Sequence, residues 1–510
     1  MHHILNTQRR SILNNMYICT SEQARFEDQR AQDFFHIPSL VLMEHAAIEC
    51  VKEILPLIKN KKVAILVGPG NNGGDGLAIA RLLYQKGISC EIYMPSMSMS
   101  ESERVQYEIL KALNVSIEHE DASILDDADL IIDALFGNGL SRSIEGKWAT
   151  LIHKVNQSKA KIVSIDLPSG LDGTSGVILG CTIQADITLA LDCMKQGQLI
   201  RQGRKCCGKI IPLDIGIPHP SLNAARLLDP DFIQLPKRAK DSHKGSFGKA
   251  LMIGGSQSMH GAITMASRAA YLSGIGTLTL MIPDCIADIL AYKMDSAMRL
   301  VCPSEKGYFA FESLAILEKN LRNYDVISIG NGLGREMISI ELLEACLKSD
   351  QALILDADAF WALQNCNDLL DRKAPTILTP HMKEFSTFMH MDLKEVLENP
   401  FEAASKFSKK YPNCTLILKS SMTIISENDQ VYVLDQANSA LAKGGSGDLL
   451  CGILLGLYGQ SKNSLKSAIA ACLIHSKAAK EDIDPACFQP EDLLNAIPKI
   501  FKTYRKKQLD

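Results

Sequence analysis

Short apolar runs alternate with segments of helical periodicity along most of this 510-residue chain. Runs that are apolar on both faces, and that are separated by helices, are typical of a parallel sheet covered on both sides. In the first half the strand-like runs lie at residues 63–67, 90–94, 128–136, 160–166, 186–192 and 209–217. The pattern predicts an α/β layer structure for this half.

A segment of different character interrupts the alternation. Residues 218–247 are rich in proline, charged and polar residues and have no clear periodicity, which is typical of a domain boundary. Strand-like runs then resume at residues 249–255, 276–283, 324–330, 352–358, 375–381, 415–420 and 430–435, and a helical pair follows at Leu449–Tyr458 and Ser464–Ala479. We therefore predict two α/β domains, at residues 1–225 and 226–510.

Residues 20–60 precede the first strand-like run and have the spacing of a helix. One face of this helix is expected to hold Leu40, Met43, Ala47, Cys50, Val51 and Ile54. The pattern predicts that this face is buried.

Composition narrows the class of protein. Apolar residues make up 46% and charged residues 22%, which is ordinary for a globular protein, and a net charge of −4 favours neither nucleic acid nor an anionic membrane. The 15 cysteines include no CxxC pair, which argues against zinc and favours a reducing compartment. No apolar stretch suits a signal peptide or a membrane span. We expect a cytoplasmic protein that binds neither nucleic acid nor membranes.

The first glycine-rich loop, GPGNNGGDG at Gly68–Gly76, follows the strand-like run at 63–67. Glycines let a backbone approach a phosphate, and a helix that begins there directs its amides at the anion. The loop satisfies G-x-G-x-x-G, but the ribose-binding acid expected after the next strand is absent. Asn71, Asn72 and Asp75 are not needed by a dinucleotide turn. They indicate contacts with a sugar, an amide or a cation as well as with phosphate.

Two aspartates interrupt otherwise apolar strands of the first half. Asp133 begins DALFGNGLSR and Asp166 lies within SIDLPSGLDG. Each alone is more often a cap or turn residue, but a buried, unpaired carboxylate is costly. The carboxyl ends of strands are also where α/β proteins bind ligands. Together with the glycine loop they predict a functional site.

These three motifs resemble those of the NAD(P)H-hydrate epimerase family over about residues 15–220. The resemblance implies a Rossmann-like three-layer α/β/α domain that interconverts the R and S epimers of hydrated nicotinamide cofactors. It implies Asp166 as the acid–base residue at C6. It also implies a potassium ion held by Asn72, Asp133 and Ser169, and a substrate lined by Asn71, Asn72, Gly73, Gly74, Asp75, Gly137, Asn138, Gly139, Leu140, Ser141, Arg142, Ser143 and Asp166. The chain has Met43-Glu44-His45-Ala46-Ala47 where the family usually has Met-Glu-Asn-Ala-Gly.

The second glycine-rich loop is GGSGD, Gly444–Asp448, directly before an apolar helical stretch. It places small residues around a helix start and an acid in the first helical turn. A plain glycine turn with an acidic helix start is the structural alternative. Further polar pieces at predicted strand ends favour a site: Gly330–Gly334, Thr379-Pro380-His381 with Glu384, and Lys419–Thr423, with Asn438 ahead of the glycine run.

This ordered set resembles the ribokinase-like family and, within it, the NAD(P)H-hydrate dehydratases, over about residues 240–505. The resemblance implies that Ala262, Gly332, His381 and Asp448 meet the hydrated nicotinamide nucleotide. It implies ADP or ATP with Mg²⁺ as co-substrate, bound by Lys419, Ser420, Ser421, Met422, Thr423 and Gly447. The family usually has Lys-Gly-Ala where this chain has Lys419-Ser420-Ser421.

The placement of the second loop implies a mechanism. Asp448 is expected to take the proton of the 6-hydroxyl, while the Gly444–Gly447 amides stabilise the transferring phosphoryl group. The phosphorylated hydroxyl then leaves as phosphate and restores the dihydronicotinamide ring.

The two resemblances together predict a bifunctional cofactor-repair enzyme, in which an epimerase supplies a dehydratase specific for the S epimer of the NADH or NADPH hydrate. They also imply a homo-oligomer. One alternative is a ribokinase-like kinase of a small hydroxylated metabolite, which would use the same GGSGD loop and the same Asp448. The other alternative is that the first half serves as a binding or scaffold module.

Overall fold

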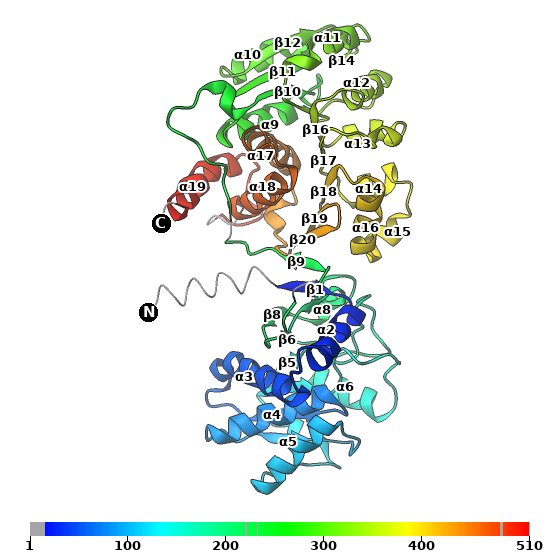
Figure 1. Cartoon of the computed structure of the whole chain (residues 1–510), viewed down its shortest axis with the longest axis vertical. Helices are drawn as coiled ribbons and strands as arrows, with labels where there is room; N and C mark the ends of the chain where they lie inside the picture. The colour runs from blue at the N-terminus through cyan, green and yellow to red at the C-terminus, as the bar shows by residue number, and fades with distance from the viewer. Residues whose placement is uncertain (1–15, 220–221, 232, 480–482, 509–510) are drawn as a thin grey trace. The chain divides into compact units, whose positions relative to one another are not determined.

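The computed structural model describes residues 16–219, 222–231, 233–479 and 483–508 (Figure 1). The chain divides into two compact units, Met1–Leu227 and Leu228–Asp510. The division lies within the segment 218–247, which also contains a short strand, β9 (Ala225–Leu227), that the sequence pattern did not predict. Within the described ranges no helix has the length and apolarity needed to cross a membrane.

The first unit is built on a six-stranded sheet in the order β3-β2-β4-β5-β6-β8. All of its neighbouring strands are parallel, as the continuous apolar runs predict. Strand β2 (Val63–Val67) coincides with its predicted run, and the others are shorter than theirs: β3 (Glu91–Tyr93), β4 (Leu130–Ala134), β5 (Lys161–Ile165), β6 (Ile187–Leu191) and β8 (Lys209–Leu213). Asp166 and Asp192 lie directly beyond β5 and β6, whereas Asp133 lies inside β4.

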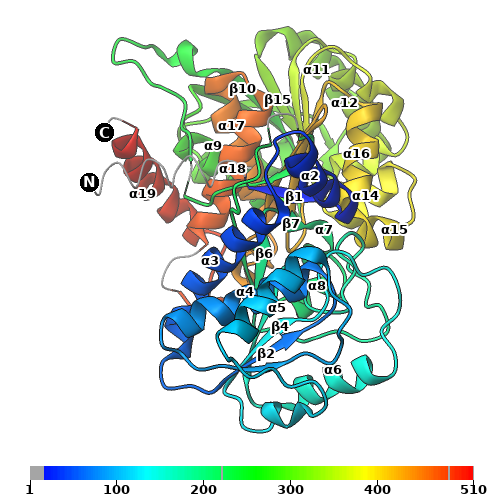
Figure 2. The same ribbon diagram turned by 60° about the horizontal axis from the view of Figure 1, so that its bottom comes forward.

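Helices cover both faces of this sheet, as Figure 2 shows. Ile65 and Ile132 belong to a core shared with α3, α4 and α5, whereas Leu66 and Ile131 belong to a separate core on the α6 side. Successive strand side chains point to opposite faces, so one apolar run supplies both cores. The helices are α3 (Ser39–Ile58), α4 (Asn71–Gln85), α5 (Glu101–Ala112) and α6 (Lys147–Gln157). The first unit is thus a three-layer α/β/α structure.

The predicted helix at residues 20–60 is two helices, α2 (Ser21–Asp33) and α3. Thr20 caps α2 in a capping box with Gln23, and Pro38 is the N-cap of α3. The predicted buried face is correct except at Leu40, which is 37% exposed. The buried face of α3 also includes Leu42, Ala46 and Ile58.

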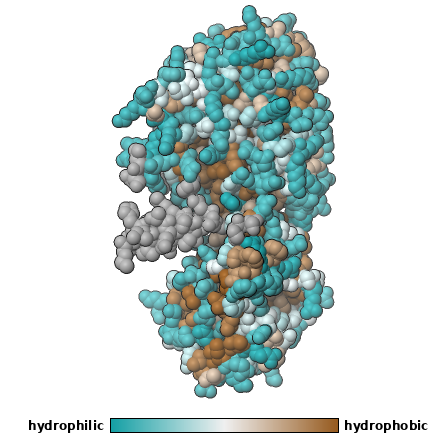
Figure 3. All heavy atoms as spheres, in the orientation of Figure 1, coloured by the Kyte–Doolittle hydropathy of each residue, from teal (hydrophilic) through white to brown (hydrophobic). Residues whose placement is uncertain are grey.

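Large hydrophobic side chains remain exposed on neighbouring helices of the first unit. Figure 3 shows hydrophobic atoms over this part of the surface. The residues are Phe26 of α2, Phe34 directly after it, Leu40, Val41 and Ile48 of α3, Tyr84 of α4, and Val105 and Ile109 of α5.

In the described part of the second unit, nine strands lie side by side in the order β12-β11-β10-β15-β16-β17-β18-β19-β20, and β13 (Ser304–Glu305) and β14 (Tyr308–Phe309) form a separate pair. Pairing is parallel from β12 to β18, and β19 and β20 are added antiparallel at one end. The strands are β10 (Lys249–Ile253), β11 (Thr277–Pro283), β12 (Met298–Cys302), β15 (Val326–Ile329), β16 (Ala352–Leu355), β17 (Thr376–Leu378), β18 (Cys414–Leu418), β19 (Thr423–Glu427) and β20 (Gln430–Leu434). Strands β12 and β19 were not predicted.

This sheet also separates two helical layers (Figure 1). One layer holds α9 (His260–Leu272), α17 (Ser446–Ser461), α18 (Ser464–Ala478) and α19 (Asp492–Lys507). The other layer contains α12 (Met337–Leu347), α13 (Ala359–Leu363), α14 (Met382–Phe388) and α16 (Pro400–Lys410), where aromatic rings such as Phe360, Phe385 and Phe407 pack together. The second unit is therefore again a three-layer structure.

Candidate functional site

A cleft of about 680 Å³ opens in the first unit beside the carboxyl ends of its parallel strands. Among the residues that line it are most of those predicted to meet the substrate: Asn71, Asn72, Asp75, Gly137, Asn138, Gly139, Leu140, Ser141, Arg142 and Asp166. Three loops separated in sequence are thus brought to one hollow.

Three residues of the predicted lining, Gly73, Gly74 and Ser143, are not part of the cleft wall. A Cβ atom at Gly73 would lie 1.9 Å from the carbonyl oxygen of Gly68, and one at Gly74 would lie 2.4 Å from the Met43 methyl group. Both glycines are therefore required for close packing behind the loop. Ser143 is exposed.

Glu103 of α5 holds the glycine loop through a hydrogen bond to its backbone. Gly70, the N-cap of α4 with φ +99°, donates its amide to Glu103 Oε2 at 2.8 Å, and Ser100 donates to the same oxygen at 3.1 Å. Burial raises the pKa of Glu103 to about 7 against both hydrogen bonds. Because the Gly70 amide is occupied by an acid, it is not free for a phosphate. The predicted phosphate contact is limited to the other amides of the loop.

Asp166 follows β5 and has a left-handed backbone, with φ +63°. Its amide donates to the Leu189 carbonyl at 2.8 Å, and its carbonyl accepts from Gln198 Nε2 at 2.8 Å. Its carboxylate accepts from the Asn138 amide through Oδ2 at 3.2 Å and forms an ion pair with Lys195 through Oδ1. Every one of these contacts is to a residue distant in sequence, so the fold determines where the carboxylate points.

Asp133 and Ser169, two of the predicted potassium ligands, contact each other. Asp133 is fully buried and accepts from Ser169 Oγ at 2.6 Å and from Ser164 Oγ at 2.7 Å. Burial raises the pKa of Asp133 above its usual value, although these hydrogen bonds oppose the shift. Ser169 Oγ also accepts from the Phe136 amide at 2.8 Å. Hydroxyl and carboxylate oxygens thus meet under the loop 136–142.

The third predicted potassium ligand, Asn72, lies against the same loop. A Cβ atom at Gly137 would lie 3.0 Å from Asn72 Oδ1, so the glycine leaves the space that the carboxamide occupies. Asn72 Nδ2 is buried and has no hydrogen-bond partner in the described structure. The carboxamide oxygen adds a third side-chain oxygen to this neighbourhood.

Three more carboxylates, Asp28, Asp75 and Asp192, line the cleft. Burial, and then the charges of Asp166 and Asp28, raise the pKa of Asp75 well above its usual value. Asp192 is instead paired with His219, whose ring contacts Asp192 and Glu27 at 2.9 Å each. The cleft therefore contains both an acid that is paired with His219 and an acid that burial favours in its neutral form.

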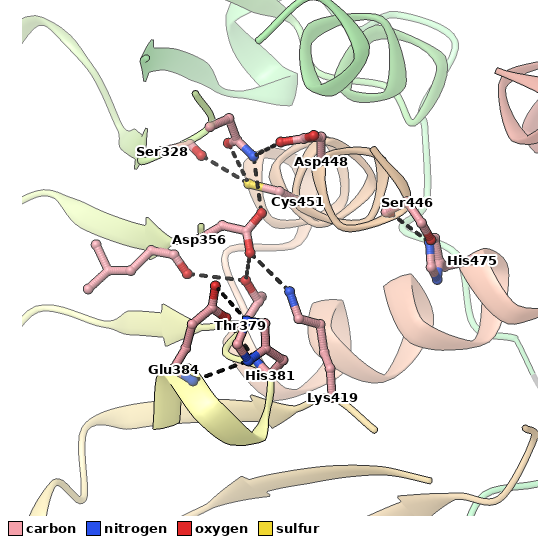
Figure 4. A network of polar contacts seen from close by, with 12 residues as sticks. Ser328, Asp356, Thr379, His381, Glu384, Lys419, Ser446, Asp448, Cys451 and His475 are labelled. Atoms are coloured by element: carbon pink, nitrogen blue, oxygen red, sulfur yellow. Dashed lines mark hydrogen bonds and ion pairs between the residues drawn. The ribbon is translucent and has the colours of Figure 1, made fainter. Parts of the chain in front are cut away.

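In the second unit, Asp448 is the third residue of α17, as the GGSGD motif predicts. Asn331 Nδ2 donates to Asp448 Oδ1 at 2.7 Å and to Asp356 Oδ2 at 3.0 Å. Figure 4 shows Asp448, Asp356 and Cys451 around this carboxamide. Burial, and then the charge of Asp356, raise the pKa of Asp448 to about 6, whereas the hydrogen bond from Asn331 lowers it.

Lys419 and Asp356 form the centre of the same network (Figure 4). Lys419 Nζ is 3.2 Å from Asp356 Oδ1, which also accepts from Thr379 Oγ1 at 2.6 Å. Burial lowers the pKa of Lys419, but the charges of Asp356 and Glu384 outweigh burial and raise it above its usual value. A Cβ atom at Gly447 would lie 3.5 Å from Lys419 Nζ. The predicted nucleotide residues Lys419 and Gly447 are therefore neighbours.

The first residue of α17 contacts a histidine that burial favours in its neutral form. His475 of α18 is buried, and its Nε2 lies 2.9 Å from the Ser446 carbonyl oxygen and 3.1 Å from Ser446 Oγ. Burial lowers the pKa of His475 to about 4. The amides of Gly447 and Asp448 lie in the first turn, where a helix supplies no partner of its own.

Three residues predicted to meet the nicotinamide nucleotide, His381, Gly332 and Ala262, have contacts of their own. His381 is paired with Lys419 in a β-bridge and caps α14 through its ring nitrogen, which accepts from Glu384 N at 3.1 Å. Gly332 lies against Ala262, because an added Cβ would be 3.2 Å from the Ala262 methyl group.

The loop after Lys419 is organised by one of its serines. Ser420 Oγ accepts from the Met422 amide at 3.2 Å, Ser421 is exposed, and Thr423 begins β19. Met422 is 3% exposed, so this residue offers a ligand little surface.

Sequence reasoning missed several residues of these sites, among them Lys195, Glu103, Asn331 and Asp356. Lys195 and Asp356 each closely follow an apolar strand, which is the signal that identified Asp166. Asn331 lies inside the motif Gly330–Gly334 that the sequence singled out. Glu103 has no such signal, because it reads as an ordinary capping-box glutamate of α5.

Comparisons with known proteins find a matching family model for each half of the chain. A family model described as NAD(P)H-hydrate dehydratase matches residues 250–499, and one described as YjeF-related protein N-terminus matches residues 39–197. Among solved structures, a ribokinase-like superfamily protein from Enterococcus faecalis is 27% identical, covering 55% of this chain and 96% of that chain, with a TM-score of 0.48. The ADP/ATP-dependent NAD(P)H-hydrate dehydratase from Bacillus subtilis, co-crystallised with ATP/Mg²⁺, is 26% identical, covering 53% and 94%, with a TM-score of 0.46.

Curated relatives match along the whole chain. The bifunctional NAD(P)H-hydrate repair enzyme Nnr of Moorella thermoacetica is 32% identical over 523 residues, covering 96% of this chain and 98% of its own. The enzyme of the same name from Coxiella burnetii is 32% identical and covers 82% of this chain and 85% of its own. The chain therefore belongs to the family of bifunctional NAD(P)H-hydrate repair enzymes.

Proposed function

We propose that the first unit interconverts the R and S epimers of NADH and NADPH hydrates and that the second unit dehydrates the S epimer, consuming ADP or ATP. The observation that carries this proposal is that each unit holds an aspartate, Asp166 or Asp448, beside a glycine-rich loop and a lysine. Family membership gives the reaction class. The positions of the two aspartates support the steps that we assign to them.

In the first unit Asp166 exchanges the proton that opens and recloses the hydrate at C6. Its Oδ2 accepts one backbone amide, from Asn138, and keeps a lone pair for the substrate. The loops at Asn71–Asp75 and Gly137–Arg142 form the cleft walls that hold the nucleotide. A fixed carboxylate within hydrogen-bond reach is what general acid–base catalysis requires.

A potassium ion would be held by Asn72, Asp133 and Ser169. The fit rests on the oxygen-only donor set and on Asp133, a buried carboxylate whose described partners are hydroxyls and amides. The bound ion would supply a positive charge beneath the loop 136–142 and fix its backbone. Epimerisation is then expected to depend on K⁺, and Asp133→Asn is expected to weaken that dependence.

In the second unit Asp448 takes the proton of the 6-hydroxyl while that oxygen attacks the terminal phosphorus of ADP or ATP. The bond from that phosphorus to its bridging oxygen breaks, so AMP or ADP leaves. The Gly447 and Asp448 amides and Lys419 stabilise the phosphoryl charge. The phosphorylated oxygen then departs from C6 as phosphate, a proton is lost, and the dihydronicotinamide ring is restored.

Mg²⁺ fits the second unit as a companion of the nucleotide. No cluster of three His, Cys, Asp or Glu side chains suited to a metal occurs in the part of the chain that the structure describes. Mg²⁺ needs no such cage, because it usually binds through substrate phosphates, waters and one or two carboxylates. It would neutralise phosphate charge there, near Asp356 and Asp448. A homo-oligomer and a cytoplasmic location complete the proposal.

The test uses the full chain with a mixture of R and S hydrates and with ADP or ATP, and follows the absorbance of the dihydronicotinamide ring. The proposed function predicts recovery of both epimers. Asp166→Asn is expected to leave only the S fraction recoverable at the original rate, and Asp448→Asn is expected to recover neither. A stable phosphorylated product without recovered cofactor would instead identify a small-metabolite kinase.

A further inference from the structure

Lys195 is a buried lysine, and each N–H group of its ammonium has an acceptor. It ends β7 (Met194–Lys195) and is 2% exposed. Its Nζ forms the ion pair with Asp166 Oδ1 and donates to the carbonyls of Leu191 at 2.9 Å and Cys193 at 3.0 Å. An ammonium has three N–H groups, and all three have acceptors. Lys195 therefore has no hydrogen to offer a substrate, and its contact with the proposed reaction runs through Asp166.

The segment that carries Lys195 holds Asp166 at a second point. Gln198 Oε1 accepts from the Lys195 amide at 2.8 Å, and Gln198 Nε2 donates to the Asp166 carbonyl at 2.8 Å. The left-handed region is disfavoured for residues other than glycine. Asp166 is in that region, so its conformation has to be maintained by its surroundings. Lys195 and Gln198 provide this support on the side chain and on the backbone.

The carboxylates near Asp166 give its ion pair with Lys195 an electrostatic role as well as a packing role. Asp28 and Asp192 line the same cleft, and a negative charge on either of them opposes the ionised form of a further carboxylate. Lys195 is the cation in direct contact with Asp166. Burial by itself lowers the pKa of Lys195, but Asp166, Cys193 and Asp192 outweigh burial and raise it above its usual value. The lysine therefore stays charged.

We propose that Lys195 is a positioning residue for epimerisation: it fixes Oδ1 of Asp166, so that Oδ2 is the oxygen that exchanges the proton with the hydrate. This inference rests on the proposed function of Asp166. It predicts that loss of the lysine slows the chemical step while the nucleotide still binds, because the cleft walls at Asn71–Asp75 and Gly137–Arg142 are unchanged.

The experiment compares Lys195→Met with Lys62→Met in the full chain. Lys62 is an exposed lysine of the same unit, and its ion pair with Asp127, at 3.1 Å, lies on the surface. Epimerisation of the R hydrate is measured as kcat and KM, and KM reports whether the first unit still binds its substrate. Dehydration of the S hydrate by the same molecules reports the state of the second unit. For Lys195→Met we expect the epimerase kcat to fall about 100-fold, with KM and dehydration within about threefold of the parent.

The same variant is expected to shift the acidic limb of the epimerase pH–rate profile to higher pH, because the cation that favours the ionised carboxylate is gone. Lys62→Met is expected to change none of these quantities. An epimerase kcat within threefold of the parent, or an unshifted profile, would overturn the proposal.

A second comparison keeps the test decisive if Lys195→Met does not fold. The double variant Lys195→Met/Asp166→Asn removes both charges and leaves no buried ion unpaired. Because Lys195 acts through Asp166, the epimerase rate of the double variant is expected to equal that of Asp166→Asn alone. A further tenfold loss would show that Lys195 acts elsewhere and would refute the proposal. Full epimerase activity of Asp166→Asn itself would instead reject the proposed function.

Discussion

The side-chain amide of Asn331 donates a 2.7 Å hydrogen bond to Oδ1 of Asp448, although the two residues are 117 positions apart. The same amide reaches Asp356 Oδ2 at 3.0 Å, so two carboxylates share one carboxamide. Cys451 Sγ in turn lies 3.2 Å from Asn331 Oδ1 and fixes which end of the carboxamide faces the acids. Asn331 thereby orients the proposed base and favours its ionised form.

Asn331→Leu tests this relationship. The free enzyme is expected to lose dehydration activity as the pH falls through about 6, where Asp448 becomes protonated. Removing the amide that lowers this pKa is expected to move the acidic limb of kcat/KM to higher pH and to reduce kcat about 10–100-fold. The exposed Asn323→Leu serves as the control. An unshifted limb would show that Asn331 does not act on Asp448.

Asp448→Asn removes the proposed base but keeps an oxygen that accepts from Asn331. We expect dehydration to fall by about 10²–10⁴-fold, the usual contribution of a general base. Nucleotide affinity, measured by calorimetry, is expected to stay within about threefold, because Lys419 and the helix amides are unchanged. Asp429→Asn, in the exposed turn between β19 and β20, is the matched control. Preserved turnover would refute the assignment of the base.

Gly445 and Gly444 are adjacent glycines with different constraints. Gly445 has φ +95°, and its added Cβ would lie 2.6 Å from the Met265 methyl group, whereas a Cβ at Gly444 meets open space. Gly445→Ala is expected to destabilise the second unit by about 1–2 kcal/mol, and Gly444→Ala by less than about 0.5 kcal/mol. Urea unfolding followed through Trp361, in a Trp148→Phe background, isolates the second unit. Equal losses would contradict the conformational explanation.

His219 gives the first unit a pH-dependent contribution to stability. Burial lowers the pKa of His219, but its hydrogen bonds and ion pairs with Asp192 and Glu27 outweigh burial and raise it from 6.5 to about 9. A raised folded-state pKa means that the stabilisation is fully present below about pH 6.5 and is lost as the pH rises through about 9. Between about pH 6.5 and pH 9, the free energy of unfolding of the parent is expected to fall by about 1–3 kcal/mol relative to that of His219→Gln.

The measurement is urea unfolding followed through Trp148, in a Trp361→Phe background, at several pH values. The exposed His153→Gln on α6 is the control and is expected to show no such window. A stability difference between the parent and His219→Gln that is constant from pH 6 to about 9.5 would show that the ring is not charged in the fold.

The strands and glycine loops follow from local pattern alone. Apolar runs such as Val63–Val67 are buried on both faces wherever a parallel sheet forms, and glycines at Gly70 and Gly445 permit a positive φ in any context. Pattern also located Asp166 and Asp448, because an acid at the end of an apolar strand or at a helix start is visible in the sequence. The strands β1 (Tyr17–Cys19), β7 and β12 escaped prediction because they are short or exposed.

Tertiary structure alone decided the partners of these residues. Whether Asp166 meets Lys195, whether Asn331 reaches Asp448, and whether Glu103 occupies the Gly70 amide depend on which strand ends become neighbours, and no local periodicity encodes this. The same holds for Gly73 and Gly74, which read as binding residues but pack against Glu103 and Met43. Hydrophobic spacing reports only the nearest few residues, whereas a site is assembled from side chains that the sheet order brings together.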